Sequence, residues 1–341
     1  MRRKNISARK TAYFLPFLLA TGIVTFTLTS CGGAEASGSG ASQSQQTGAS
    51  AAQTRSVPQE PTGPREKGTR DNTPVCLVPD APGDTVYEND YAHVDASNIS
   101  EGYVVVRYTG QSSKVKLQIT GPDQTTYTYN LSTAEQKDEV FSLQSGNGDY
   151  MINVYENIEG TQYSEAFSQL LTVNIDNEFS PFLYPNQNCS FASSNEAVKK
   201  SEDLAYVCNN DLEVVSEVYN YVISNIVYDH EEAETVASGY IPDIDEVLST
   251  KKGICLDYSA LMTAMLRSQR IPTRMEIGYA GTAYHAWLST YIEDVGWVNG
   301  MIEFDGTDWS LMDPTFASNN SDETLKTFIG DGSNYRVKYI Y

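Results

Sequence analysis

Three side chains towards the C-terminus, Cys255, His285 and Asp313, are of the types that perform nucleophilic catalysis. Cys255 follows a glycine turn and begins an apolar pattern of helical period, so we expect it in the first turn of a helix. The unpaired N–H groups and the dipole of a helix start favour negative charge, and the thiolate is the reactive form of cysteine. A cysteine, a histidine and an aspartate in this order indicate a nucleophile, its base and the group that orients the base.

Each of these side chains also has a structural interpretation. Cys255 could be a buried helix cysteine, His285 a core residue of a strand, and Asp313 a turn residue before proline. Taken together the three favour catalysis, in which His285 holds the Cys255 proton and returns it to the leaving amine. Asp313 would accept a hydrogen bond from the other ring nitrogen and fix the tautomer. The backbone N–H of Cys255 is the expected oxyanion donor, and the sequence identifies no side-chain partner for it.

The segment that contains these residues is expected to fold as helices followed by strands. Apolar residues recur at steps of three and four from Leu212 to Ile226, with Asp211 as the expected N-cap. The helix that begins at Cys255 must end before Pro272, because proline disfavours helix in the residue before it. Helices before antiparallel strands define an α+β domain, here residues 179–341. A further short helix is predicted over residues 244–248, and strands over residues 274–279, 286–291, 297–299 and 309–312.

Residues 76–178 have the pattern of a different domain. Short β-type runs recur at a spacing of about ten residues, and turns rich in Gly, Pro and Asn separate them. This spacing predicts an antiparallel β-sandwich of immunoglobulin or fibronectin type. The region has no cluster of candidate catalytic residues, so we interpret it as a spacer or a binding module.

The N-terminus is interpreted as a targeting segment and a tether. Residues 1–31 contain a basic start, a largely apolar stretch and then Cys31, which resembles a bacterial lipoprotein signal. In such signals the chain is cut before the cysteine and lipid is attached to its sulfur, which would anchor the protein to the outer face of the cytoplasmic membrane. A transmembrane anchor or an ordinary secretory signal is the alternative. Residues 32–75 contain almost no large apolar side chains, so a disordered tether is predicted.

Composition limits the remaining functions. The 341-residue chain has 23 basic and 44 acidic side chains, and its formal net charge of −21 argues against nucleic acid as a partner. No C-x-x-C pair occurs and only three histidines are present, so no metal site is expected, and no cofactor is implied. Cys76, Cys189 and Cys208 are interpreted as small buried residues. A disulfide between Cys189 and Cys208 is the alternative if the chain is exported.

A set of short motifs extends beyond the three candidate catalytic residues. The motifs are Gly253-Ile254-Cys255-Leu256-Asp257-Tyr258-Ser259, Leu266-Arg267, Ile271-Pro272-Thr273-Arg274, Gly278-Tyr279, His285-Ala286-Trp287, Gly296-Trp297 and Asp313-Pro314-Thr315. In identity, order and spacing they resemble the bacterial transglutaminase-like superfamily, whose members share a papain-like core. The resemblance covers roughly residues 210–318, with 30 residues from Cys255 to His285 and 28 from His285 to Asp313.

The resemblance implies that Cys255 is the nucleophile, His285 the base and Asp313 the orienting acid. Members of this family cross-link glutamine to amines, hydrolyse amide bonds as proteases or glycanases, or have lost activity. One position departs from the family, because Arg270 stands where a glycine usually precedes Ile-Pro. Glycine suits the left-handed residue at a helix end, so we expect this helix end to be strained or built differently.

The expected function is that of a thiol enzyme on the outer face of the bacterial cell membrane. It would transfer acyl groups or hydrolyse amide or peptide bonds through an acyl-enzyme on Cys255, and its substrate would be a protein or peptide, cell-wall peptide included. The sequence does not decide between transfer to an amine and hydrolysis, and a protease that processes peptides or peptidoglycan is one form of the second. The alternative from another class is a non-catalytic lipoprotein that binds cell-wall or protein ligands and keeps a relic triad.

Overall fold

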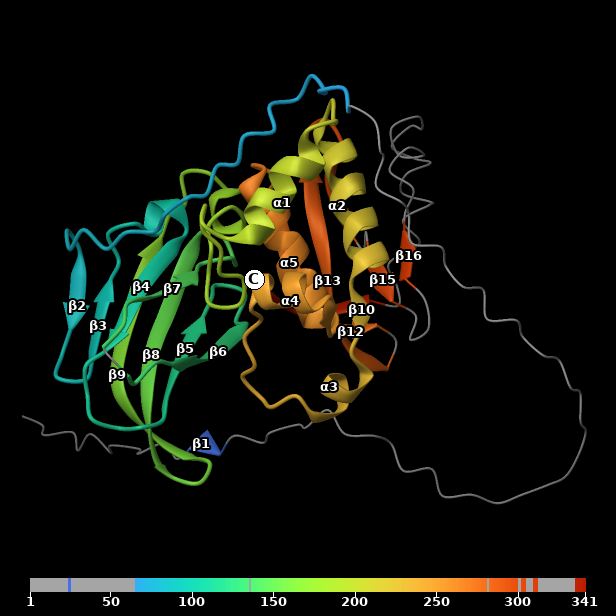
Figure 1. Ribbon diagram of the computed structural model, residues 1–341. Coiled ribbons are helices and arrows are strands. Elements are labelled where there is room, and N and C mark those ends of the chain that lie inside the picture. The colour runs from blue at the N-terminus through green and yellow to red at the C-terminus, as the bar shows by residue number, and fades with distance from the viewer. Residues whose placement is uncertain are drawn as a thin grey trace, which may run out of the picture.

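The computed structural model of the protein describes residues 24–25, 65–134, 136–280, 282–299, 302–304, 309–311 and 335–341 (Figure 1). Two of the predicted site residues, Cys31 and Asp313, lie outside these ranges. The described residues form two units with separate hydrophobic cores, one built from two sheets and one from helices and a sheet. Within the described ranges, no helix combines the length and the apolar character needed to cross a membrane.

The first unit consists of two antiparallel sheets that share one core (Figure 1). Side-chain alternation explains the packing, because Val115, Leu117 and Ile119 are buried and the residues between them are partly exposed. The predicted β region before the α+β domain is therefore present. One sheet has the order β2 (Val86–Glu88), β3 (Ala92–Asp95), β4 (Tyr103–Tyr108) and β7 (Glu139–Ser142). The other has the order β1 (Val24–Thr25), β9 (Gln162–Val173), β8 (Gly148–Glu159), β5 (Val115–Thr120) and β6 (Thr126–Leu131).

The second unit is built around helix α5 (Cys255–Ser268). Every residue from Asp257 to Ser268 is buried, because α5 packs against three helices and the sheet. Its helical neighbours are α1 (Glu196–Ala205), α2 (Asp211–Asn225) and α4 (Ile244–Thr250). The sheet has the order β14 (Gly296–Asn299), β13 (Ala283–Ile292), β12 (Thr273–Ala280) and β17 (Tyr335–Ile340), and α5 contacts β12 and β13. The smaller elements are η1 (Ile99–Glu101), η2 (Ser180–Phe182), β10 (Val227–Tyr228), α3 (His230–Thr235), β11 (Lys252–Gly253), β15 (Ile302–Phe304) and β16 (Trp309–Leu311). The predicted α+β arrangement is confirmed.

Local hydrogen bonds set where the helices begin. Asn210 is the N-cap of α2, and its side chain accepts from Glu213 N–H at 2.9 Å. The helix therefore starts one residue earlier than predicted, because asparagine caps as well as aspartate does. Asp243 caps α4 in the same way, and that helix continues two residues past its predicted end. Helices α1 and α3 were not predicted from the sequence.

Residues 65–75, which we call the strap, cross the helices of the second unit before the chain enters the first (Figure 1). Gly68 N–H donates to Tyr206 O at 2.9 Å, and Val75 N–H donates to Ser268 O at 2.7 Å. The prediction of a disordered tether is therefore wrong for these residues. Composition was misleading here because hydrogen bonds to the helices, and not burial of large apolar side chains, hold the strap in place.

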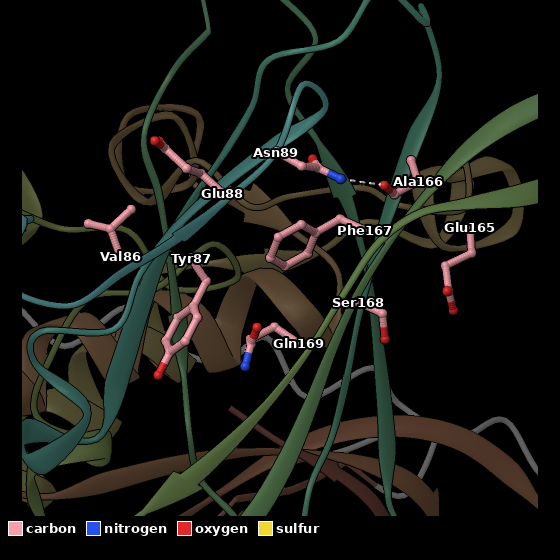
Figure 2. A pocket seen from close by; sticks show the side chains of 9 residues that line it. All are labelled: Val86, Tyr87, Glu88, Asn89, Glu165, Ala166, Phe167, Ser168 and Gln169. Carbon is pink, nitrogen blue, oxygen red and sulfur yellow. Dashed lines mark hydrogen bonds between the residues drawn. The ribbon is translucent and has the colours of Figure 1, made fainter. Parts of the chain in front are cut away.

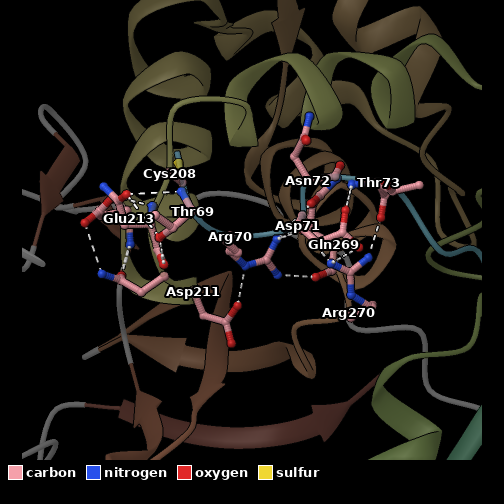
Figure 3. Close-up of polar contacts among 12 residues, drawn as sticks. Thr69, Arg70, Asp71, Asn72, Thr73, Cys208, Asp211, Glu213, Gln269 and Arg270 are labelled. Carbon is pink, nitrogen blue, oxygen red and sulfur yellow. Dashed lines mark hydrogen bonds and ion pairs between the residues drawn. The ribbon is translucent and has the colours of Figure 1, made fainter. Parts of the chain in front are cut away.

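Arg70 fastens the strap to two helices (Figure 3). Its Nε donates to Asp211 Oδ1 at 2.6 Å, at the start of α2, and its Nη1 donates to Gln269 Oε1 at 3.0 Å, just after α5. We expect Arg70→Ala to lower the free energy of unfolding by about 2 to 3 kcal/mol, because the partly buried acceptors on Asp211 and Gln269 lose their donor. Urea unfolding measures this. The control Arg65→Ala breaks a more exposed pair with Asp203 and should cost less than about 1 kcal/mol; equal effects of the two substitutions would contradict the role given to Arg70.

The strap also explains why Arg270 stands where the transglutaminase-like family usually has glycine. This residue follows α5 with φ +67°, the left-handed conformation in which the family usually has glycine. Its guanidinium donates to the carbonyl oxygens of Thr73 and Asp71 in the strap (Figure 3). Only a long side chain can make these bonds, and glycine could not. Arg270 therefore keeps a strained positive φ in exchange for holding the strap.

The C-terminal strand joins the two units. The Tyr341 ring lies 5.6 Å from the Tyr127 ring and 6.1 Å from the Tyr129 ring, both on β6 of the first unit. Tyr339 lies 5.5 Å from Tyr127. Because β17 also pairs with β12, the first unit packs directly on the sheet of the second.

Cys189 and Cys208 are thiols inside the fold. Cys189 and Cys208 are buried and unlinked, so the interpretation as small buried residues is confirmed for them and the disulfide alternative is wrong. Their sulfurs lie 3.5 Å from Ala260 O and 3.6 Å from Leu204 O. Burial raises the pKa of the Cys189 thiol to about 11 and that of the Cys208 thiol to about 12, which leaves both unreactive near neutral pH.

Candidate active site

Cys255 is the first residue of α5, as predicted, and its side chain is partly exposed. The turn before it requires glycine, because a Cβ on Gly253 would lie 2.7 Å from the Cβ of Asp257. The N-cap, Ile254, has no polar side chain to satisfy the first backbone N–H groups of the helix. The thiol therefore stands at a helix start whose N–H groups and dipole favour a thiolate.

Asp257 closes this first turn. Its Oδ2 accepts from Ile254 N–H at 2.8 Å, and its Oδ1 accepts from the Tyr240 hydroxyl at 2.8 Å. The carboxylate is buried, and this burial raises its pKa. Asp257 is thus a helix cap that also holds the loop before α4.

Tyr228 is a functional candidate that the sequence analysis missed. The two-residue strands β10 and β11 pair in parallel, so Tyr228 lies beside Gly253, two residues before Cys255. Burial is the main cause that raises the pKa of Tyr228 to about 12, and the Cys255 thiol raises it further while a hydrogen bond with the Cys255 backbone lowers it. The phenol also forms a hydrogen bond with the Cys255 side chain, and it stays protonated at neutral pH.

His285 lies in β13, which packs against α5. It is 7% exposed, and it stands opposite Gly278 in the pairing of β12 with β13. Its ring centroid lies 6.2 Å from that of Trp287, with the planes inclined by 25°. The structure thus places Cys255 and His285 on two elements in contact, and Asp313 lies outside the described residues.

Negative charge surrounds the first turn of α5. Asp229 pairs with Lys252 at 2.6 Å, and burial together with Asp257 and Asp229 raises the pKa of Glu232. These carboxylates oppose a thiolate on Cys255, so ionisation depends on the helix N–H groups and on a cationic partner such as an imidazolium. In the described part of the chain, no group of three or more His, Cys, Asp or Glu side chains could hold a metal ion.

A pocket of about 600 Å³ lies in the first unit, between β2 and β9, and not at Cys255 (Figure 2). Asn89 Nδ2 donates to Ala166 O at 2.9 Å across it. The lining contains no thiol or imidazole, so this pocket has none of the groups of the predicted triad. The lining residues are Val86, Tyr87, Glu88, Asn89, Glu165, Ala166, Phe167, Ser168 and Gln169.

Comparison with known proteins gives a family for the second unit. The model of the Transglutaminase-like superfamily matches residues 199–300, a range that includes Tyr228, Cys255 and His285. The UPF0252 protein MJ1282 of Methanocaldococcus jannaschii is 28% identical over 96 residues, which are 25% of this chain and 27% of that protein. The chain therefore matches only about a quarter of the length of this relative.

Three solved structures are similar at a low level. A "putative cysteine protease" from Cytophaga hutchinsonii is 18% identical with a TM-score of 0.32, covering 68% of this chain and 79% of that one. A "putative protease" from Parabacteroides distasonis is 12% identical with a TM-score of 0.28, covering 61% and 57%. Red sea bream transglutaminase is 11% identical with a TM-score of 0.25, covering 62% and 48%. TM-scores this low support no argument, so the assignment depends on the family match. The chain contains a domain of the transglutaminase-like superfamily, matched over residues 199–300.

Proposed function

We propose that this protein is a thiol enzyme that acts on amide bonds through an acyl-enzyme on Cys255. The observation that carries the proposal is the position of Cys255, which is the partly exposed first residue of a buried helix and is hydrogen-bonded to the phenol of Tyr228. The family match supports the same reading. His285 is the base, and Asp313 is the acid that orients it. Only the sequence motif Asp313-Pro314-Thr315 supports the role of Asp313.

In the first half-reaction, the Cys255 thiolate bonds to the carbonyl carbon and the carbonyl oxygen takes up the electron pair. The resulting oxyanion accepts hydrogen bonds from Cys255 N–H and the Tyr228 hydroxyl. As the C–N bond breaks, His285 gives its proton to the departing amine and a thioester remains. An amine or a water molecule then attacks the thioester carbonyl and gives a proton to His285, and the C–S bond breaks to return the Cys255 thiolate. One acyl-enzyme therefore serves both transfer and hydrolysis.

Tyr228→Phe tests the oxyanion donor. We expect acylation of Cys255 by p-nitrophenyl acetate to slow about 100-fold, because loss of one oxyanion-hole donor costs about that much. Alkylation of Cys255 by iodoacetamide forms no oxyanion, so it should slow far less, and only through the lost hydrogen bond from the phenol to the sulfur. The matched control is Tyr240→Phe, which removes a phenol that donates to Asp257 in the same helix turn. Its effect on acylation should be much smaller. Equal slowing of acylation and alkylation by Tyr228→Phe would contradict the proposed role.

One experiment identifies the reaction. The acyl-enzyme on Cys255 is captured from a cell-surface extract, and mass spectrometry identifies the attached acyl group. The substrate so defined is then incubated with the enzyme and a labelled amine. Incorporation of the amine indicates transfer, and release of new amino groups without incorporation indicates a peptidase. A Cys255 thiol no more reactive than a free thiol would instead favour the non-catalytic binding lipoprotein.

We propose further that Cys31 carries the lipid that anchors the enzyme outside the cytoplasmic membrane. The sequence supports this through the basic start, the apolar stretch and the cysteine of residues 1–31. The first unit would then be an immunoglobulin-like or fibronectin-like spacer or binding module. Labelled palmitate should enter the wild-type protein and not Cys31→Ala; incorporation into both would exclude Cys31 as the site.

A further inference from the structure

A buried carboxylate, Glu276, lies near His285 and has no part in the chemistry proposed above. In the pairing of β12 with β13, Glu276 stands opposite Trp287 and Gly278 stands opposite His285. Residues two apart on a strand share one face of the sheet. Glu276, Trp287, His285 and Ser289 are therefore neighbours on one face.

Both carboxylate oxygens of Glu276 accept hydrogen bonds. Trp287 Nε1–H donates to Oε2 at 2.6 Å, and the Ser289 hydroxyl donates to Oε1 at 2.8 Å. All three residues are buried: Glu276 is 5% exposed, Trp287 is 2% exposed and Ser289 is 0% exposed. A buried charge is costly unless its hydrogen bonds are satisfied, so these side chains hold one another in a single arrangement.

Trp287 connects this arrangement to the candidate base. Its ring lies against that of His285, at a centroid distance of 6.2 Å and an angle of 25°. The indole cannot turn without losing its bond to Glu276. The imidazole therefore packs against a surface whose orientation Glu276 fixes.

We propose that Glu276 is a positioning residue for His285 and acts through the ring of Trp287. The inference rests on the proposed function, because it requires His285 to be the base. The carboxylate orients the indole, and the indole restricts the imidazole to the orientation that serves Cys255. The negative charge on the same face of the sheet also favours the imidazolium form.

Other charged groups face this network. Burial raises the pKa of Glu276, and its two hydrogen bonds and the Arg274 guanidinium lower it in part. Arg274 lies on the same strand, and its guanidinium is 3.7 Å from the centroid of the Trp297 ring. Burial lowers the pKa of Arg274, and the carboxylates of Glu276 and Glu178 raise it in part.

The test replaces Glu276 by glutamine, which keeps the shape and removes the charge. The chain has three histidines, so the ring-proton NMR resonances of His285 can be assigned by substitution. We expect Glu276→Gln to move these resonances, to shift the titration of His285 to lower pH and to slow alkylation of Cys255 by iodoacetamide at mildly acidic pH about 10-fold. A small misplacement of a catalytic group can cost up to about 100-fold in rate. Trp287→Phe, which keeps a ring without the N–H donor, should move both readouts in the same direction.

Thr290→Val is the matched control. Thr290 is the buried residue next to Ser289 on the same strand, so its side chain points to the other face, and its hydroxyl has no hydrogen-bond partner. This substitution should leave the resonances and the alkylation unchanged. If Glu276→Gln does not fold, Ser289→Ala, which removes one donor to the same carboxylate, should shift the resonances to a smaller extent.

Two results separate this inference from the function it rests on. If Glu276→Gln lowers the melting temperature but leaves the His285 resonances and the pH dependence of alkylation unchanged, Glu276 is only structural and the inference is wrong. If wild-type Cys255 reacts like a free thiol and His285→Ala changes nothing, the proposed function fails. In that case the His285 resonances still decide whether Glu276 fixes the ring.

Discussion

Cys255→Ala is expected to reduce acylation by p-nitrophenyl acetate to the uncatalysed rate, a loss on the order of 10⁴-fold or more. The buried thiols of Cys189 and Cys208 cannot substitute for it, because burial raises the pKa of Cys189 to about 11 and of Cys208 to about 12. The burst of p-nitrophenolate at known enzyme concentration measures the effect. In wild type the burst should approach one equivalent, and in Cys255→Ala it should vanish.

Cys76→Ala is the control for this substitution. Cys76 is the other partly buried thiol of the described chain, and burial raises its pKa as well. Its replacement should leave the burst unchanged. A burst that persists in Cys255→Ala and disappears in Cys76→Ala would place the nucleophile elsewhere and contradict the proposed function.

The largest effect on stability is expected at Arg267. This side chain is 1% exposed, and it donates to Thr273 O at 3.0 and 2.8 Å, to Tyr184 O at 2.7 Å and to Tyr341 O at 2.7 Å. It thereby ties α5 to the segment after the first unit, to β12 and to the C-terminal strand. Arg267→Met fills similar space but leaves one buried and two partly buried carbonyl groups without this donor. We therefore expect a loss of about 4 kcal/mol in unfolding free energy.

Urea unfolding compares this variant with Arg107→Met. Arg107 pairs with Asp138 at 2.7 Å on the surface of the first unit, where both side chains are partly exposed. That exchange should cost less than about 1 kcal/mol. A loss at Arg267 no larger than that at Arg107 would show that the buried guanidinium contributes little, and that the helix–strand junction is held by apolar packing alone.

The sequence predicted those features that local signals determine. A glycine turn followed by apolar residues at helical spacing located the start of α5, and alternation located β5 and its neighbours. Arg270 was recognised as a departure at a helix end, and its positive φ agrees with that expectation. These features depend on residues within one or two turns of each other, where spacing alone is informative.

Features that depend on distant pairings were not predictable from spacing. Tyr228 reaches Cys255 only because two short strands pair in parallel across the segment that contains α3 and α4. The strap has the composition of a tether, and its order depends on acceptors such as Asp211 and Gln269, far along the chain. Glu276 lies within a predicted strand, yet its bond to Trp287 requires the register of β12 with β13.

The pairing of Cys255 with His285 is tested by the rate of Cys255 alkylation by iodoacetamide, followed from acidic to basic pH in wild type and His285→Ala. The proposed thiolate–imidazolium pair predicts rapid, selective alkylation at mildly acidic pH in wild type. His285→Ala should shift the rise in rate towards the pKa of an ordinary thiol, about 8.5. Identical pH profiles for the two proteins, both rising only near that value, would contradict a catalytic pair and leave Cys255 an ordinary helix cysteine.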